Sequence, residues 1–166
     1  PKTRHYESGS ISFQASSDTV TRLTRLCRDS GTTLFMTLLG VMSVLLSKYA
    51  RQDDIVVGSP VANRNQNEVE SLIGFFVNTL VLRIDLTDNP SFSKVLKRVK
   101  QTALEAFDHQ DIPFEKLVEA IAPERHLNIS PLFQVSFAVQ NAPVEDMQLA
   151  GLSVQPLTDV ETGMGR

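Results

Sequence analysis

Asn78 is a polar residue in a mostly apolar segment, so its amide needs hydrogen-bond partners if the folded chain buries it. It shares one face of an alternating segment, residues 76–84, with Leu80 and Leu82, and this pattern predicts a strand with the amide on an apolar face. A buried amide without hydrogen-bond partners costs about 1–3 kcal/mol. Two interpretations stay open: the amide ties the strand to a neighbouring loop, or it faces a substrate channel and positions a carbonyl or an amine.

Arg64 presents a similar choice at the end of another segment. Residues 54–57 are typical of a buried strand, and the run 58–64 follows them directly. An arginine just beyond a strand is usually solvated or locally paired. Its planar guanidinium group is also suited to bind a carboxylate across an interface. The residues alone favour neither use.

No familiar catalytic or metal-binding pattern accompanies these two residues. The three histidines, His5, His109 and His126, lie far apart, and none has a second ligand at the helical spacing that zinc sites use. The sequence contains neither a phosphate-binding glycine loop nor a Gly-x-Ser-x-Gly nucleophile elbow. Cys27 lies on the apolar side of a predicted amphipathic helix, where we expect a buried, inert thiol. The residues therefore predict no metal site and no nucleophile.

Four helical patterns must help to position the polar residues. Their expected limits are Ser16 or Ser17 to Gly31, Thr32 or Thr33 to about Ala50, Asn89-Pro90 to about residue 108, and Pro113 to Pro123. The second pattern is apolar around much of its circumference, which predicts a buried core helix. In the third, Pro90 is expected at the first helical position, where its missing N–H costs nothing.

Five segments are expected as strands, and they complete the predicted fold. They are residues 10–14, 54–57, 76–84, 132–140 and 151–155. Segment 76–84 is apolar on both faces along most of its length, which predicts a central strand covered on two sides. Together with the helices, this order predicts a mixed α/β (α+β) architecture in which helices flank a sheet.

Length and composition exclude several classes of function. The chain has 166 residues, 42% of them hydrophobic and 21% charged, which is typical of one globular domain or one large lobe. A net charge of -3 argues against binding to nucleic acid or a membrane surface. The most apolar stretch, residues 34–46, is shorter than the ~18–20 residues of a membrane span. The single cysteine fits a reducing cytoplasm, and a start at Pro1 without Met or a signal pattern suggests a piece of a longer chain.

Four motifs in order resemble those of condensation domains from nonribosomal peptide synthetases. Residues 53–64, DDIVVGSPVANR, resemble the strand-and-loop signature of that family, and residues 73–79, IGFFVNT, resemble its next motif. Residues 109–118, HQDIPFEKLV, and 131–137, PLFQVSF, resemble the two that follow. The resemblance covers nearly the whole chain, but only about the second half of such a domain.

The resemblance implies a fold like chloramphenicol acetyltransferase, with two lobes in a V and a tunnel between them. Peptidyl carrier domains bring donor and acceptor on phosphopantetheine arms, and the acceptor amine attacks the donor thioester to form a peptide bond. The family's His-His-x-x-x-Asp-Gly motif belongs to the N-terminal lobe and is absent from this sequence. Residues 1–166 are therefore expected to be a C-terminal lobe that is inactive alone, binds no cofactor directly, and works beside an adenylation domain.

The resemblance also assigns expected places to individual residues. Asn78 is similar to a family asparagine near the tunnel, and Arg64 to an arginine that pairs with the Asp of the missing motif. The His109–Phe114 segment keeps a structural interpretation, in which His109 caps one helix and Pro113 begins the next. The expected site residues are Asn78, Ser59, Gln134 and Ser136 for the tunnel, and Arg64 and Asn63 for the contact between lobes; no catalytic residue is expected in this chain.

Alternatives within and beyond the family stay open. The form of residues 60–64, PVANR, is associated with condensing members rather than with the epimerisation branch, while the cyclisation branch is marked by a histidine motif that this chain does not contain. The other class of function is a non-catalytic module that binds carrier domains or partner subunits. A half-domain should expose an apolar face between lobes and self-associate, whereas a binding module should be monomeric.

Overall fold

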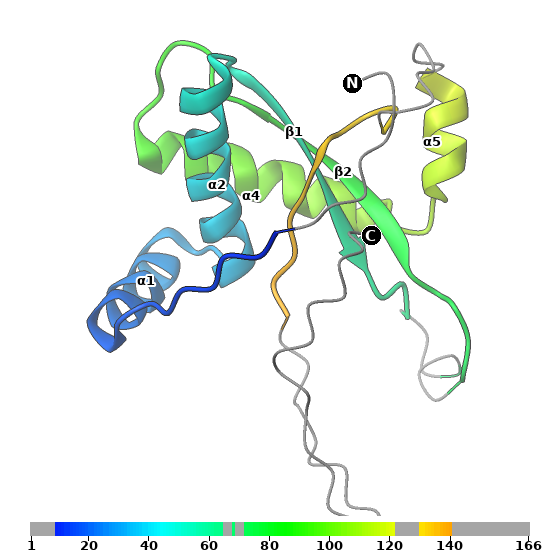
Figure 1. Cartoon of the computed structure of the whole chain (residues 1–166), viewed down its shortest axis with the longest axis horizontal. Coiled ribbons are helices and arrows are strands. Elements are labelled where there is room, and N and C mark those ends of the chain that lie inside the picture. The colour runs from blue at the N-terminus through cyan, green and yellow to red at the C-terminus, as the bar shows by residue number, and fades with distance from the viewer. Residues whose placement is uncertain (1–8, 65–67, 69–71, 122–129, 141–166) are drawn as a thin grey trace, which may run out of the picture. The chain divides into compact units, whose positions relative to one another are not determined.

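The computed structural model describes residues 9–64, 68, 72–121 and 130–140 (Figure 1). The elements, in order, are α1 (Ser17–Ser30), α2 (Leu34–Ala50), β1 (Asp54–Val61), β2 (Asn78–Asp85), α4 (Phe92–Asp108), α5 (Phe114–Ile121) and β3 (Val135–Ser136). All of them belong to one compact unit, Ala15–Ala138. The described residues of the other unit, 9–14 and 139–140, form no helix or strand.

The sheet has three strands in the order β2-β1-β3. β1 and β2 are antiparallel, with a register that runs from Asp54 opposite Asp85 to Val61 opposite Asn78. β3 is parallel to β1 and pairs Val135 with Val57. The prediction of a central strand at 76–84 is wrong for the described residues, because β1 lies in the middle and β2 at an edge. Its second face, which carries Thr79, Val81 and Arg83, is only partly covered or exposed.

One face of the β1–β2 hairpin packs against α2 and α4 and forms the core (Figure 1). Register places the buried pairs Ile55–Ile84 and Val57–Leu82 side by side on this face. The remaining buried apolar residues of the core are Met36, Leu39, Leu80, Leu86, Val95, Val99 and Ala103. Burial of a Val, Leu, Ile or Met side chain stabilises the fold by about 1.5–3 kcal/mol. The core thus fixes the hairpin on the helices and leaves the 61–78 end of the hairpin beyond them.

The ends of the first two helices confirm the sequence predictions. The Ser16 side chain accepts a hydrogen bond from the backbone N–H of Thr19 at 3.2 Å. Gly31 ends α1 in the left-handed region at φ 61°, where glycine has no Cβ to clash. Thr33 caps α2 in the same way as Ser16 caps α1, accepting from Met36 N–H at 3.2 Å.

Other boundaries differ from the predictions. Helix α4 begins at Phe92 after the cap residue Ser91, because Asp88 and Asn89 take left-handed conformations (φ 67° and 46°) and Pro90 precedes the cap residue. Residues 10–14 form no strand, and both Ile11 and Phe13 are almost fully exposed. Of the predicted strand 132–140 only Val135–Ser136 pairs, and segment 151–155 lies outside the described residues.

Helix α2 is less buried than its sequence predicts. Met36, Thr37, Leu39, Gly40 and Ser43 are buried against the core, and a Cβ at Gly40 would lie 3.4 Å from Leu96 of α4. On the opposite side, however, Leu45 is 49% exposed. The prediction of a core helix is therefore correct for one face and wrong for the other.

Candidate functional site

Three of the six predicted site residues, Asn63, Arg64 and Asn78, lie at the end of the hairpin beyond the core. A groove of about 320 Å³ opens there between the end of β1, the start of β2 and the start of α5. Its lining residues are Asn63, Phe75, Val77, Asn78, Thr79, Asp111, Pro113, Phe114 and Glu115. Two of the predicted site residues, Asn63 and Asn78, line this groove. Ser59, Arg64, Gln134 and Ser136 are not among its lining residues.

Asn78 makes four hydrogen bonds and thereby joins β2 to the α4–α5 connection. Its Nδ2 donates to the carbonyl oxygens of Gln110 at 2.7 Å and Ile112 at 2.8 Å. Its Oδ1 accepts from the backbone N–H groups of Thr79 at 2.8 Å and Phe114 at 3.1 Å. These bonds use both N–H groups and both lone pairs of the amide. The side chain therefore acts as a structural tie here, and its place along a substrate tunnel stays a prediction.

The segment before α5 is held in the shape that Asn78 binds. His109 is the C-cap residue of α4, and its Nδ1–H donates to the Glu105 carbonyl at 2.9 Å. The N–H of Ile112 donates to the His109 carbonyl at 3.1 Å. Pro113 O accepts from Lys116 N–H at 3.0 Å as α5 starts. Both structural predictions for this motif, the cap at His109 and the helix start at Pro113, are confirmed.

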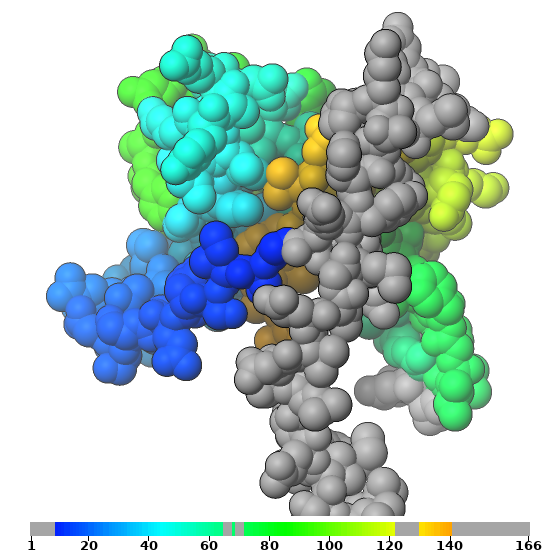
Figure 2. All heavy atoms as spheres, viewed as in Figure 1, coloured from blue at the N-terminus to red at the C-terminus, as the bar shows by residue number. Residues whose placement is uncertain are grey.

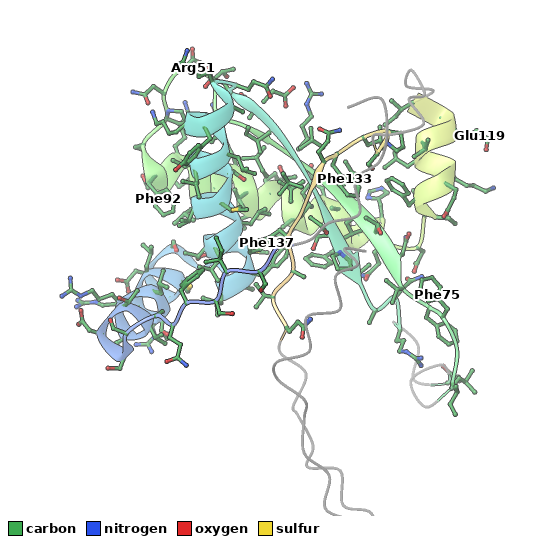
Figure 3. All side chains as sticks on the ribbon, in the orientation of Figure 1. Arg51, Phe75, Phe92, Glu119, Phe133 and Phe137 are labelled. Atoms are coloured by element: carbon green, nitrogen blue, oxygen red, sulfur yellow. The ribbon has the colours of Figure 1, made fainter. Side chains whose placement is uncertain are left out.

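Phe133 fits against β1 because Gly58 has no side chain. A Cβ at Gly58 would clash with the Phe133 ring. That ring, whose residue is labelled in Figure 3, meets Phe114 edge-on with centroids 5.7 Å apart. The Gly58 carbonyl accepts from Phe137 N–H at 2.8 Å and from Ser136 Oγ–H at 3.3 Å. Gly58 thus anchors the segment that contains β3, which in turn contacts the first residue of α5.

Ser59 and Gln134 lie away from the groove surface. Ser59 is 2% exposed and stands opposite Leu80 on the core face of the hairpin. Gln134 is exposed, and its Nε2 donates to the Ser130 carbonyl at 3.3 Å. With the hydrogen bond from Ser136 to Gly58, all three residues make local structural contacts. Tunnel contacts by these three residues stay predictions.

Arg64 contacts the other arm of the hairpin connection. Its guanidinium carbon lies 4.4 Å from the centroid of the Phe76 ring, a cation–π distance, and its Nη2 lies 3.5 Å from the Gly74 carbonyl. Asn63 has a left-handed backbone (φ 52°), and its buried Oδ1 has no hydrogen-bond partner among the described residues. A contact of either residue with a second lobe stays a prediction.

The exposed apolar residues beside Arg64 were not predicted from the sequence. Phe75 is 90% exposed and extends from the hairpin end (Figure 3), while Ile73 and Val77 are also exposed. The signal was the pair Phe75-Phe76, since successive residues of an extended chain point to opposite faces, and here the face that carries Phe75 is exposed. Phe76 is the covered one, beneath Arg64. Exposed apolar clusters of this kind are typical of contact surfaces.

The two carboxyl groups whose pKa is lowered, those of Asp54 and Asp85, lie at the opposite end of the hairpin from the groove. The hydrogen bond from Arg83 lowers the pKa of Asp54, with Arg83 Nη2 2.8 Å from Asp54 Oδ2. Hydrogen bonds from the hydroxyl and N–H of Thr87 lower the pKa of Asp85. In the part of the chain that the structure describes, no group of three or more His, Cys, Asp or Glu residues could hold a metal ion. No single described helix is long and apolar enough to cross a membrane.

The fold and its motifs define a class of protein, and comparison with known families identifies that class. The family model described as "Condensation domain" matches residues 1–161, and the chain belongs to this family. One component of the linear gramicidin synthase of Brevibacillus parabrevis is 51% identical over 157 residues, 95% of this chain and 3% of that protein. Malpinin synthetase of Mortierella alpina is 46% identical over 94% of this chain and 2% of its own length. The chain thus spans a few per cent of these relatives.

Solved structures agree with this assignment. A four-domain nonribosomal peptide synthetase bound to AMP and glycine matches with a TM-score of 0.84 and 28% identity, over 88% of this chain and 11% of the other. The X-domain from teicoplanin biosynthesis matches with a TM-score of 0.65 and 30% identity, over 69% of this chain and 26% of the other. These likenesses confirm the predicted α/β fold of the condensation-domain type.

Proposed function

We propose that this chain is the C-terminal lobe of a condensation domain that forms peptide bonds between substrates held on carrier domains. The observation that carries the proposal is the family match over residues 1–161. The four motifs resemble, in order, those of the second half of such a domain, which supports the C-terminal position. The His-His-x-x-x-Asp-Gly sequence of the other lobe does not occur among these residues. Catalysis then requires both lobes.

In the proposed reaction, the acceptor amine attacks the carbonyl carbon of the donor thioester. A C–N bond forms, the C–S bond breaks, and the amine proton is transferred as the donor thiol leaves. A group that takes up this proton has to lie within hydrogen-bond reach of the amine. We assign this group to the N-terminal lobe and structural support to the described residues: Asn78 holds the α4–α5 connection against β2, and the groove beside it combines apolar walls with side-chain oxygen acceptors.

The complete domain that we propose works with several partners. They are the donor and acceptor carrier domains with their phosphopantetheine arms, the N-terminal lobe, and a neighbouring adenylation domain. The exposed residues Ile73, Phe75 and Val77 and the nearby Arg64 support a contact surface at this end of the hairpin. We propose the N-terminal lobe as its partner, and the cytoplasm as the location.

The test compares a complete condensation domain that contains these residues with the 166-residue chain alone. Each is mixed with donor and acceptor carrier domains loaded with aminoacyl groups, and peptide transfer is followed by mass spectrometry of the carriers. We expect transfer with the complete domain and none with the 166 residues. Transfer by the short chain alone, or no transfer by a folded complete domain with any loaded pair, would contradict the proposal.

One relative supports a second candidate, a non-catalytic module that binds a protein partner. The X-domain from teicoplanin biosynthesis, 30% identical to this chain, has also been solved in complex with OxyB. The two candidates differ in what the short chain does alone. A binding module should be a monomer that binds a carrier domain in titration calorimetry. A lobe should self-associate through the exposed apolar residues Ile73, Phe75 and Val77.

A further inference from the structure

Helix α2 carries an apolar stripe on the side opposite to the core. Leu34, Val41, Leu45 and Tyr49 are 46%, 45%, 49% and 84% exposed. At 100° per residue these positions fall within about 80° of one another, and the buried Ser43 falls on the opposite side. The stripe is about 22 Å long at 1.5 Å per residue. Figure 2 shows atoms of α2, in cyan, at the surface of the molecule.

The composition of this helix is unlike that of a solvent-facing helix. Its 17 residues include one charged side chain, Lys48, in the last turn. A surface helix normally carries charged and polar residues opposite its buried face, and a helix that is apolar all round is normally buried. The exposed face of α2 therefore has the chemistry of a contact between helices rather than of a water-exposed surface.

The neighbouring helix does not cover the stripe. The chain direction turns by 102° between α1 and α2, so the two helices cross instead of running side by side. Their polar contacts lie near the start of α2, where Cys27 Sγ is 3.2 Å from Thr37 Oγ1 and Thr32 Oγ1 is 2.8 Å from the same atom. Leu45 and Tyr49 are two and three turns further along and are left exposed.

The spacing of the stripe specifies the kind of partner. With the half-covered Leu38, the residues recur at intervals of four, three and four along 34, 38, 41 and 45. This is the narrow seam along which a second helix packs at a shallow angle of about 20°.

We infer that an amphipathic helix from the rest of the same condensation domain packs lengthwise on this α2 stripe. The size of the solved relatives supports this source, because the chain covers only 26% of the X-domain chain and 11% of the four-domain synthetase chain. The inference depends on family membership and not on the proposed peptide-bond chemistry. It predicts that the stripe is covered in the complete domain and open in the 166-residue chain.

Cysteine labelling tests this directly. Cys27 is replaced by serine, which can keep the hydrogen bond to Thr37, and Leu45→Cys provides the one thiol in the stripe. Arg25→Cys on the exposed side of α1 is the matched control. We expect a fluorescent maleimide to react with Leu45→Cys at least about tenfold more slowly in the complete domain than in the short chain, because burial leaves only transient opening for reaction. The control should react at similar rates in both.

Each other result would overturn the inference. Equal Leu45→Cys rates in both chains would mean that nothing covers the stripe. If the short chain is labelled slowly, and more slowly as the protein concentration rises, a second copy is the occupant. If it is labelled slowly at every protein concentration, the short chain's own residues cover the stripe. Because labelling needs no turnover, a domain that fails to make peptide bonds can still pass. Leu45→Lys provides a second measurement, with a lowered melting temperature expected in the complete domain only.

Discussion

Replacing Asn78 with alanine should destabilise the fold by about 2–4 kcal/mol. The variant leaves two carbonyl oxygens and two N–H groups, from Gln110, Ile112, Thr79 and Phe114, without their shared partner. A typical hydrogen bond contributes about 0.5–1.5 kcal/mol net, so four give about 2–6 kcal/mol. The upper part of that range is excluded because Asn78 is only half-buried and water can reach some of the released groups.

Urea unfolding of the 166-residue chain, followed by far-ultraviolet circular dichroism, measures the loss. Gln134→Ala is the matched control, because Gln134 is an exposed amide with one hydrogen bond, to the Ser130 carbonyl. The control should change the free energy of unfolding by less than about 0.5 kcal/mol. Equal unfolding midpoints for Asn78→Ala and Gln134→Ala would refute the structural role of the Asn78 amide.

Hydrogen exchange separates the two halves of the amide. Asn78→Asp keeps oxygen acceptors for the N–H groups of Thr79 and Phe114 but loses both donors to the α4–α5 connection. We expect these two amides to stay protected in the aspartate variant and to exchange faster in the alanine variant. Fast exchange in both variants would mean that the donors alone hold the connection in place.

Three further substitutions test other contacts. Gly58→Ala should destabilise the chain by about 1–3 kcal/mol in urea unfolding, because the new methyl group displaces the Phe133 ring; a smaller loss in the Phe133→Ala background would confirm the clash, and additive losses would refute it. Asp54→Asn should make the free energy of unfolding fall less as the pH is lowered, because the pKa of Asp54 is lowered in the folded chain, and the stability this carboxyl adds above its unfolded pKa is lost as the pH falls through its folded pKa. The effect should be small because the pair with Arg83 is exposed. Parallel stability curves of the variant and the wild type between pH 7 and pH 3 would contradict it. Arg64→Ala should slow peptide transfer by the complete domain while Arg64→Lys restores part of it through the cation–π contact; unchanged transfer in Arg64→Ala would exclude a role between lobes.

Local sequence signals predicted helix ends and the fold class well. The Ser16 and Thr33 caps and Gly31 act through neighbours within four residues, so the sequence carries the whole explanation. The α4 start was misplaced by two residues because proline fits both the first position of a helix and the turn before it, and the left-handed Asn89 decides between them. Helix and turn propensities of the residues do not distinguish between these two positions of the proline.

The partners of Asn78 could not be predicted because they are distant in sequence and belong to the backbone. The groups that bind its amide at 110, 112 and 114 lie 32 to 36 residues downstream. Every residue carries the same N–H and C=O, so no side-chain pattern marks which of them will face an amide. The alternation on 76–84 could place Asn78 on an apolar face, but only the folded chain separates a structural tie from a free substrate contact.

The error on α2 has a different origin. A helix that is apolar on nearly all sides predicted burial on all sides, and the 166 residues bury the face that carries Leu39 while leaving the face that carries Leu45 exposed. In the linear gramicidin synthase component, the segment that matches this chain is about 3% of the protein. The composition of α2 would then record contacts made by the complete domain. On this reasoning the mismatch between pattern and burial at Leu45 is itself the evidence for a further packing layer, and labelling at that position decides it.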